Sequence, residues 1–487
     1  MRGRFAPYIV GLGLLGLAVI AVFFCVYALL LGESALGFAL TCALSLALGG
    51  PLVWIGTSDA GPTRREALIG VLLLWFILPI VGMIPYIESG AFSVLNALFE
   101  STSGFTATGA TALRDFSAVS DSLFMYRALS QWLGGIGIIV LFIAVFPQLA
   151  IAGRQLFFAE APGPSEEKLT PRLRNTASAV LIVYVGLSIV CGLAYWLAGM
   201  TPYNAVAHTF TTLAASGFSP DPLSFEGFDN PAIDIVAIFF MTFAGVSFAL
   251  QYQAVSGRPQ DLLRDTEVRA YLAILLVASA LLAFALRDTY APLEAVRHAT
   301  FQAVSIMTTT GYASANFAEW SQQAQVVLLV LMFIGGSAGS AAGGVKVIRW
   351  LIIAQNMGRE VRRALHPKAV LPVRVGNHLV EEEVLRAVAA FLTLYLSLFA
   401  VIAGVVIWLG ADIVTGLTAS IACIGNVGPG LGAVGPMLNF ADLHPVSRAL
   451  LIFAMYAGRL EVVTVFIVFN RDFWHLPKRR TFQRRPM

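Results

Sequence analysis

Long apolar stretches recur along the whole chain, and short polar segments separate them. Ten of these stretches are long enough to be membrane-spanning helices, because a bilayer core of about 30 Å requires about 20 apolar residues of helix. The predicted spans are Tyr8–Leu31, Leu36–Thr57, Ala67–Ile87, Ser122–Phe146, Ala177–Ala198, Ala232–Val255, Val268–Leu286, Ala324–Asn356, Val384–Leu409 and Val446–Phe469. An even number of crossings places both termini on the same side of the membrane.

A second, shorter pattern follows the third, fifth, seventh and ninth spans. At each place a partly apolar segment, too short to cross the bilayer, ends in small and hydroxyl residues around a glycine. The four motifs are Glu100–Gly109 (ESTSGFTATG), Thr211–Gly217 (TTLAASG), Ser305–Gly311 (SIMTTTG) and Ser420–Gly428 (SIACIGNVG). Each motif predicts a re-entrant helix that enters the membrane from outside, stops midway and continues as a short strand.

Four such strands can share one axis and surround a narrow passage with backbone carbonyls. Non-helical backbone at membrane depth is tolerated where it lines water or is buried in protein, and carbonyl oxygens can replace the hydration shell of a monovalent cation. Glycine allows the positive φ angles that turn successive carbonyls inward. Hydroxyls could add oxygen ligands at Thr106, Thr108, Thr308, Thr309 and Thr310. The alternative is that these are ordinary turn residues. That interpretation fits a single segment, but it explains four equivalent copies on the same side of the membrane less well.

Composition and charge support an integral membrane protein. Hydrophobic residues make up 58% of the 487 positions and charged residues 12%, whereas soluble domains carry about 25% charged residues. This balance argues against a soluble enzyme, a disordered regulator and a secreted disulfide scaffold. The four cysteines lack metal-ligand spacing, and a net charge of +3 is too small to indicate nucleic-acid binding.

Basic residues are distributed unequally between the two sides of the predicted topology. The side opposite the termini carries only a few of the 31 Lys and Arg residues: Arg114, Arg127, Arg287, Arg297 and Arg448. The positive-inside rule therefore predicts that both termini are cytoplasmic. The outer face is net negative on this topology, which would concentrate cations at its mouth.

The eighth span contains an unusual glycine-rich segment. Gly335, Gly336, Ser337, Gly339, Gly343 and Gly344 lie within ten residues of one another, at 335–344. Each interior glycine costs about 1 kcal/mol of helix stability relative to alanine, so this density predicts a broken helix and a flexible intramembrane loop. The alternative is close helix–helix packing through small residues.

An arginine lies within the last predicted span. A charge at this depth costs roughly 2.5–3.5 kcal/mol on insertion scales, so Arg459 is expected to face protein or water. One interpretation is a fixed positive charge beside the pore, below the carbonyl ring. The alternative is a local ion pair with Glu461 or a side chain that extends to the membrane surface.

Three motifs resemble those of the Trk/Ktr/HKT superfamily of potassium transporters. The resemblance covers essentially the whole chain. The three motifs are Phe99–Thr111 (FESTSGFTATGAT), Met307–Phe317 (MTTTGYASANF) and Gly425–Gly432 (GNVGPGLG). The resemblance implies an all-α integral membrane fold with four M1–P–M2 pore repeats in a pseudo-fourfold arrangement. Two extra N-terminal transmembrane helices, found in one branch of the family, would precede the repeats.

The resemblance also implies a selectivity filter for potassium. The filter residues carried over by position are Thr106, Ala107, Thr108, Gly109, Ala214, Ala215, Ser216, Gly217, Thr308, Thr309, Thr310, Gly311, Gly425, Asn426, Val427 and Gly428. Glycine at all four final positions is similar to the potassium-preferring pattern, whereas serine in the first repeat marks sodium-preferring relatives. One departure is the second filter segment, Ala214–Gly217, which lacks threonine and so offers fewer side-chain oxygens.

The family's gate is implied at the broken span, with Arg459 against the loop. By the same resemblance, the chain is expected in the bacterial cytoplasmic membrane as a homodimer that binds a TrkA-like cytosolic ring of nucleotide-binding domains. No cofactor is expected on this chain itself, because it has neither a Walker-type lysine loop nor a dinucleotide-binding glycine motif. The resemblance implies that potassium is the substrate and is held at the filter residues.

The predicted domains follow the repeats. An N-terminal pair covers residues 1–60, and pore repeats cover 61–150, 151–260, 261–360 with the loop 335–344, and 361–487 with a basic tail. The predicted function is potassium uptake by passive flux through a gated pore. Two rivals remain: a symporter that couples potassium to protons or sodium through a buried carboxylate such as Glu461, and a membrane-embedded enzyme, for which the spans lack a paired catalytic set.

Overall fold

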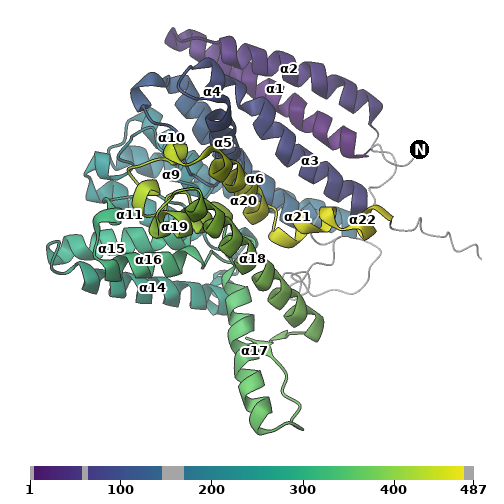
Figure 1. Ribbon diagram of the computed structural model, residues 1–487, viewed down its shortest axis with the longest axis vertical. Helices are drawn as coiled ribbons and strands as arrows, with labels where there is room; N and C mark the ends of the chain where they lie inside the picture. Colours follow the sequence, from purple (N-terminus) through teal and green to yellow (C-terminus); the bar gives the residue numbers. More distant parts are fainter. Residues whose placement is uncertain (1–4, 57–63, 145–168, 377, 476–487) are drawn as a thin grey trace, which may run out of the picture.

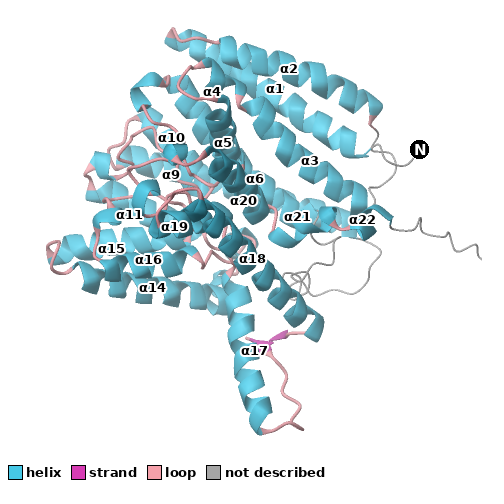
Figure 2. Ribbon diagram, in the orientation of Figure 1, coloured by secondary structure: helices cyan, strands magenta, loops and turns pink. Residues whose placement is uncertain are grey.

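The structure, a computed structural model, describes residues 5–56, 64–144, 169–376 and 378–475, and nearly all of its regular structure is helical (Figure 2). The two strands, β1 (Arg374–Val375) and β2 (His378–Leu379), pair antiparallel, with Arg374 opposite Leu379. The described part therefore confirms the all-α prediction. The predicted domain boundaries at 60/61 and 150/151 lie outside the described residues.

Six described helices are long and apolar enough to cross a bilayer, and two bent helix pairs bring the number of candidate spans to eight. The six are α1 (Phe5–Leu31), α2 (Leu36–Ile55), α3 (Arg64–Gly82) together with the short α4 (Ile84–Glu88), α9 (Leu169–Leu197), α14 (Thr266–Leu286) and α18 (Glu382–Trp408). They coincide with six of the ten predicted spans. The predicted ends at Thr57 and Phe146 lie outside the described residues.

The N-terminal pair forms a layer against α3 at one side of the molecule (Figure 1). Glycines let α1 and α2 approach closely, because a Cβ built on Gly11 would lie 2.9 Å from the carbonyl oxygen of Gly49. Large apolar side chains such as Phe23 and Leu30 point outward and are exposed. Such a surface requires lipid rather than water around it.

Four short helices each precede a glycine-containing strand, as predicted for the re-entrant segments. They are α5 (Val94–Phe105), α10 (Pro202–Leu213), α15 (Pro292–Met307) and α19 (Ile413–Ile424). Side chains of Ser93, Thr201 and Asp412 cap three of them by accepting a backbone N–H bond, whereas α15 begins at Ala291 without a side-chain cap. These four are called pore helices below.

The helices that follow the strands differ from one another. In the first repeat, α6 (Asp121–Ala144) is one continuous helix. In the second, α11 (Pro231–Ala244) and α12 (Phe248–Val255) meet at 102°, and in the fourth, α20 (Pro445–Arg459) and α21 (Val462–Phe469) meet at 110°. In the third, α16 (Gln322–Met332) is separated from α17 (Val347–Leu365) by a non-helical segment.

Two of these bends correct the predicted straight spans Ala232–Val255 and Val446–Phe469. Hydropathy alone does not detect a bend, because both arms stay apolar. At the second bend, Glu461 has a φ of 63°, which ends the helix, and its carboxylate pairs with Arg349 at 2.6 Å. Contacts with another repeat therefore hold the bend in place.

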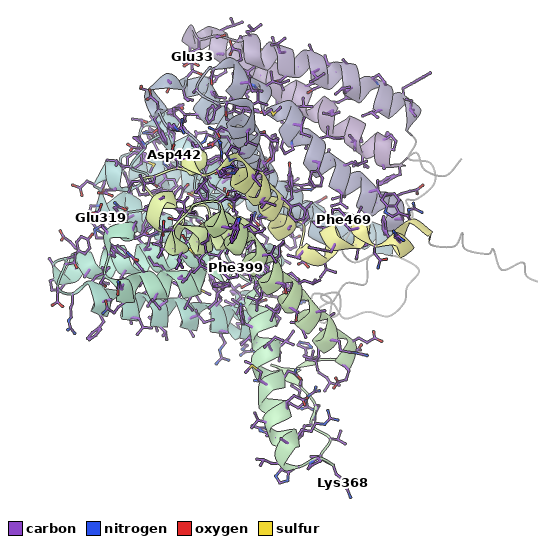
Figure 3. The ribbon with its side chains drawn as sticks, in the orientation of Figure 1. Glu33, Glu319, Lys368, Phe399, Asp442 and Phe469 are labelled. Atoms are coloured by element: carbon purple, nitrogen blue, oxygen red, sulfur yellow. The ribbon has the colours of Figure 1, made fainter. Side chains whose placement is uncertain are left out.

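One helix projects away from the rest of the molecule. The C-terminal part of α17 extends with the short β1–β2 pair beside it (Figures 1 and 2). Lys368 marks the tip of this projection, at the opposite end of the view from Glu33 (Figure 3). The remaining helices, α13 (Pro259–Arg264) and α22 (Arg471–His475), are short.

Candidate ion-conduction site

The C-terminal ends of the four pore helices meet the four predicted filter segments. The first residue of each segment caps its pore helix, at Thr106, Ala214, Thr308 and Gly425. A helix C-terminus carries about half a negative charge, which favours a nearby cation. Fourteen of the sixteen residues of the four segments are buried, and the other two, Gly109 and Gly217, are partly buried.

The four segments share one backbone conformation, although their sequences differ. The second residue is left-handed in every segment, with φ of 49° at Ala107, 53° at Ala215, 60° at Thr309 and 53° at Asn426. The fourth residue is left-handed in three of them, at Gly109, Gly311 and Gly428. The same turn of the chain therefore recurs four times.

Backbone hydrogen bonds repeat with the same pattern. The amide of each third residue donates to a carbonyl five residues earlier: Thr108 to Ser103 at 2.8 Å, Ser216 to Thr211 at 3.0 Å, Thr310 to Ser305 at 2.9 Å and Val427 to Ala422 at 2.8 Å. Because the N–H and C=O of one trans peptide point in opposite directions, the carbonyls of the second residues point away from the pore helices. Within the described part of the chain, no donor bonds a carbonyl oxygen of the four segments.

The fourth-position glycines close the segments into a ring. A Cβ on Gly109 would lie 2.8 Å from the amide nitrogen of Gly217. Built on Gly217 it would clash with the carbonyl oxygen of Thr310, and on Gly311 with that of Val427. On Gly428 it would lie 2.9 Å from the carbonyl oxygen of Thr108, which returns to the first segment. Only glycine fits where each segment passes the next one.

The sequence suggested that threonine hydroxyls add oxygen ligands to the passage. In the structure, hydroxyls of these segments instead form hydrogen bonds within the protein. The hydroxyl of Thr106 donates to the carbonyl of Thr102 at 2.7 Å, and that of Thr308 donates to the carbonyl of Val304 at 2.8 Å. Thr309 directs its hydroxyl to the glycine-rich loop described below. Backbone carbonyls are therefore the oxygens best placed to meet an ion.

Polar side chains on the pore helices support the strands beyond the ring. Glu100, His208 and Gln302 each lie nine residues before the fourth-position glycine of their own repeat. Gln302 donates to the carbonyl of Tyr312 at 3.0 Å, and His208 Nε2 lies 3.1 Å from the hydroxyl of Ser219. The imidazole of His208 is thus held by hydrogen bonds within its own repeat. Sequence reasoning missed the shared spacing, although the aligned repeats contain that signal.

Glu100 forms a buried ion pair behind the first segment. Its carboxylate lies 2.6 Å from Arg127 Nε, and both side chains are at most 3% exposed. The carboxylate also accepts the amide of Ala112 at 2.7 Å, while Arg127 donates to the carbonyl of Ser219 at 3.1 Å. The pair therefore joins the strands of the first and second repeats.

A cavity lies against the ring on the side of the strand ends. Gly109, Gly217 and Gly311 line it, together with Asp221 from the second repeat. This arrangement provides an approach to the ring that carries one acidic side chain. A negative group at such a mouth raises the local concentration of cations.

The glycine-rich segment 335–344 is non-helical, as its composition predicts, and lies directly beneath the ring. Ile334 and Val345 form a parallel bridge that closes the segment into a loop. Near its C-terminal end, Gly343 leaves no room for a Cβ against the carbonyl of Gly425. The close-packing alternative is therefore partly right, because the glycines pack tightly, but they pack as a loop and not as a helix. This segment is called the intramembrane loop below.

Neighbouring elements hold the intramembrane loop by directed bonds. The carboxylate of Glu267, at the start of α14, accepts the amides of Ala338 at 2.9 Å and Ile348 at 3.0 Å. The bend between α11 and α12 contributes as well, because the amide of Ser337 donates to the carbonyl of Gly245 at 2.8 Å. Glu267 was not identified from the sequence, since it lies at the end of an ordinary apolar span.

Arg459 connects the loop to the first repeat. Its guanidinium donates to the carbonyls of Ala341 at 2.9 Å and of Gly134 in α6 at 3.1 Å, and the residue is 3% exposed. The alternative ion pair with Glu461 is wrong, because that carboxylate bonds Arg349. Lys346 is also buried, and its ammonium donates to the carbonyl of Ala342. Two positive groups therefore lie under the ring.

Comparison with known proteins agrees with this geometry. A sequence family described as TrkH, cation transport protein, matches residues 37–476. The chain belongs to the TrkH family. It is 38% identical over 445 residues to the Trk system potassium uptake protein TrkH of Escherichia coli K12, covering 90% of this chain and 92% of that protein. The Trk system potassium uptake protein TrkI of Halomonas elongata is 35% identical over 481 residues, 97% of each chain.

A solved structure supports the same assignment. The crystal structure of the potassium transporter TrkH from Vibrio parahaemolyticus superposes with a TM-score of 0.88 at 35% identity, covering 97% of this chain and all of that one. The resemblance to the superfamily and the fold of four pore repeats after an N-terminal helix pair are therefore confirmed. The TrkH family consists of transport proteins, so the chain is not an enzyme.

Proposed function

We propose that this TrkH-family chain conducts potassium into a bacterial cell through the ring of four glycine-containing segments. The observation that carries the proposal is the closed ring, in which amides bond to the pore helices and carbonyls point the other way. Oxygens in this arrangement can replace the water around an alkali ion. The relatives named as Trk system potassium uptake proteins support potassium as that ion.

In this proposal the selectivity filter consists of residues 106–109, 214–217, 308–311 and 425–428. The second-position carbonyls face the axis from all four repeats. The filter is shorter than a five-residue potassium-channel loop, so it offers fewer ion sites in a row. We expect it to prefer potassium over sodium less strongly than such a channel does.

The proposed gate is the intramembrane loop with Arg459. The loop lies under the ring, and two buried positive groups, Arg459 and Lys346, raise the barrier for a cation below the filter. Conduction would require the loop to leave this position. The bonds from Arg459 to Ala341 and Gly134 stabilise the closed arrangement.

Assembly and placement complete the proposal. The chain would be the membrane subunit of a multi-component system in the cytoplasmic membrane, a homodimer with one pore per protomer and both termini cytoplasmic. A TrkA-like cytosolic ring would control the gate by binding nucleotide. The projection formed by α17 and the β1–β2 pair lies on the side of the molecule away from Asp442, where such a ring would approach (Figure 3).

Passive flux is favoured over proton- or sodium-coupled symport. A proton-coupled carrier needs a buried carboxylate that gains and loses a proton during transport. Glu461, the carboxylate considered for this role, is held by Arg349 at 2.6 Å, and Glu100 is held by Arg127. A proton carrier built on either carboxylate would have to break its ion pair in every transport cycle.

Ion flux in liposomes containing the purified chain tests the proposal. With potassium as the only alkali cation on both sides, the current should reverse at the potassium equilibrium potential whatever the proton gradient. A reversal potential that shifts with the proton gradient at constant potassium would establish symport instead. Absence of potassium flux, with and without a cytosolic partner ring, would reject the function.

The variant Gly109→Ser tests the filter assignment in the same vesicles. A Cβ at this position would lie 2.8 Å from the amide nitrogen of Gly217, at a φ of 84° that side chains disfavour. We expect the potassium-to-sodium permeability ratio to fall towards one. An unchanged ratio would show that selectivity does not depend on this ring.

A further inference from the structure

A single side-chain bond connects the third filter segment with the intramembrane loop. The amide nitrogen of Gly343 donates to the hydroxyl of Thr309 at 2.6 Å, and the two partners are 34 residues apart in sequence. The side chain of Thr309 is fully buried. A backbone group of the loop is therefore bonded to a residue whose own carbonyl belongs to the ring.

The conformation of Thr309 makes this bond unusual. Its φ of 60° lies in the left-handed region, which β-branched residues avoid. Alanine occupies the equivalent position in the first two repeats, as Ala107 and Ala215, with nearly the same φ. The ring therefore does not need threonine for its backbone, and the strained choice indicates a separate role for the hydroxyl.

The loop fits closely at this place. A Cβ on Gly343 would meet the carbonyl of Gly425 and would lie 2.9 Å from the Cβ of Asn426. The C-terminal end of the loop at Gly343 thus lies against the third and fourth segments, with the amide of Gly343 bonded to Thr309. Any movement of Gly343 away from the ring breaks this hydrogen bond.

We propose that Thr309 is a positioning residue that latches the intramembrane loop to the filter in the non-conducting state. The inference rests on the proposed function and adds a residue to its gate. This hydrogen bond joins the loop to the third segment, so the position of the loop depends on the conformation of the segment. By the same linkage, the conformation of the segment depends on the position of the loop. Arg459 holds the loop from below, and Thr309 holds it from the filter.

The test is potassium flux through Thr309→Ala in liposomes without a partner ring. Alanine keeps the segment conformation seen in two other repeats and removes the hydroxyl together with the γ-methyl group, whereas Thr309→Val removes the hydroxyl and keeps the branched shape. Loss of one buried hydrogen bond that favours the closed loop should raise flux roughly two- to tenfold. Thr309→Ser restores a hydroxyl and should bring the flux back towards that of the unmodified chain. Thr393→Ala, an exposed threonine on α18, is the matched control.

A second measurement separates a latch from general damage to the filter. Hydrogen exchange of peptides that cover residues 336–345 should be faster in Thr309→Ala, while the potassium-to-sodium permeability ratio is retained. Equal flux in Thr309→Ala and the unmodified chain, or a fall in both flux and selectivity, would overturn the latch. If the alanine variant does not fold, Thr309→Val provides the same test, because it keeps the shape and lacks the hydroxyl. Failure of the proposed function is distinct, since the unmodified chain would then show no potassium flux at all.

Discussion

The two halves of the pore differ in symmetry. In the filter half, four pore helices and four segments repeat the same backbone turn, the same amide bonds and the same tight glycine contacts. In the loop half, the helices after the segments are continuous in the first repeat, bent by 102° and 110° in the second and fourth, and interrupted in the third.

The difference in symmetry indicates which features of the pore must be the same in all four repeats. A ring of oxygens around one ion requires equal geometry from all repeats, so the backbone is the same even where side chains differ, as between Ala107 and Asn426. Control of flow requires only one movable element. The third repeat provides the loop. The bend at Gly245 and the guanidinium of Arg459 contact it from other repeats, and Arg459 is bonded in turn to the carbonyl of Gly134.

The largest effect is expected from a substitution that breaks the ring. In Gly311→Ala, the added methyl would overlap the carbonyl of Val427 at a φ of 81°. We expect potassium uptake to fall to background in cells that lack other uptake systems. Gly404→Ala is the matched control, because nothing lies within 4 Å of a Cβ at that position in α18. Normal uptake by Gly311→Ala would mean that the close approach of segments is dispensable.

A smaller effect is expected in the support behind the ring. Glu100→Ala leaves Arg127 buried without its carboxylate, which typically destabilises a protein by about 3–5 kcal/mol. The apparent unfolding temperature of the purified chain in detergent should fall markedly. The exposed pair of Arg114 and Asp442 gives the comparison, since Asp442→Asn should cost less than about 1 kcal/mol. Similar losses in the two variants would contradict the structural role of the buried pair.

The loop half should respond by opening rather than by unfolding. Arg459→Ala removes two charge-assisted bonds to the loop and to α6, each worth about 1.5–3 kcal/mol. We expect potassium flux in liposomes to rise by at least about tenfold, with the permeability ratio unchanged. Unchanged flux would show that Arg459 does not hold the closed state.

The smallest effect concerns the one uncapped pore helix. Three pore helices begin with a capping side chain, but α15 begins at the exposed Ala291. Ala291→Ser should stabilise the chain by about 0.5–2 kcal/mol, seen as a modest rise in unfolding temperature. In the opposite direction, Ser93→Ala should lower that temperature. A loss of stability in Ala291→Ser would show that the start of α15 differs from the other three.

The sequence by itself determined the local properties of this protein. Apolar length predicted the spans, the four short motifs predicted re-entrant helices, and glycine density predicted the break after α16. These properties depend on neighbouring residues, whose hydropathy and φ preferences are visible in one chain. The sequence also contained the shared spacing of Glu100, His208 and Gln302, nine residues before the fourth-position glycine of each repeat. Comparing the repeats position by position would have revealed it.

Tertiary structure decided which distant groups meet. It paired Glu461 with Arg349 and not with Arg459, set the bends at Gly245 and Glu461, and placed Gly343 under Thr309. Gly134 and Arg459 are separated by 325 residues, and nothing local to either specifies that contact. It arises only when the four repeats close around one axis, because closure brings the end of the last repeat against the first.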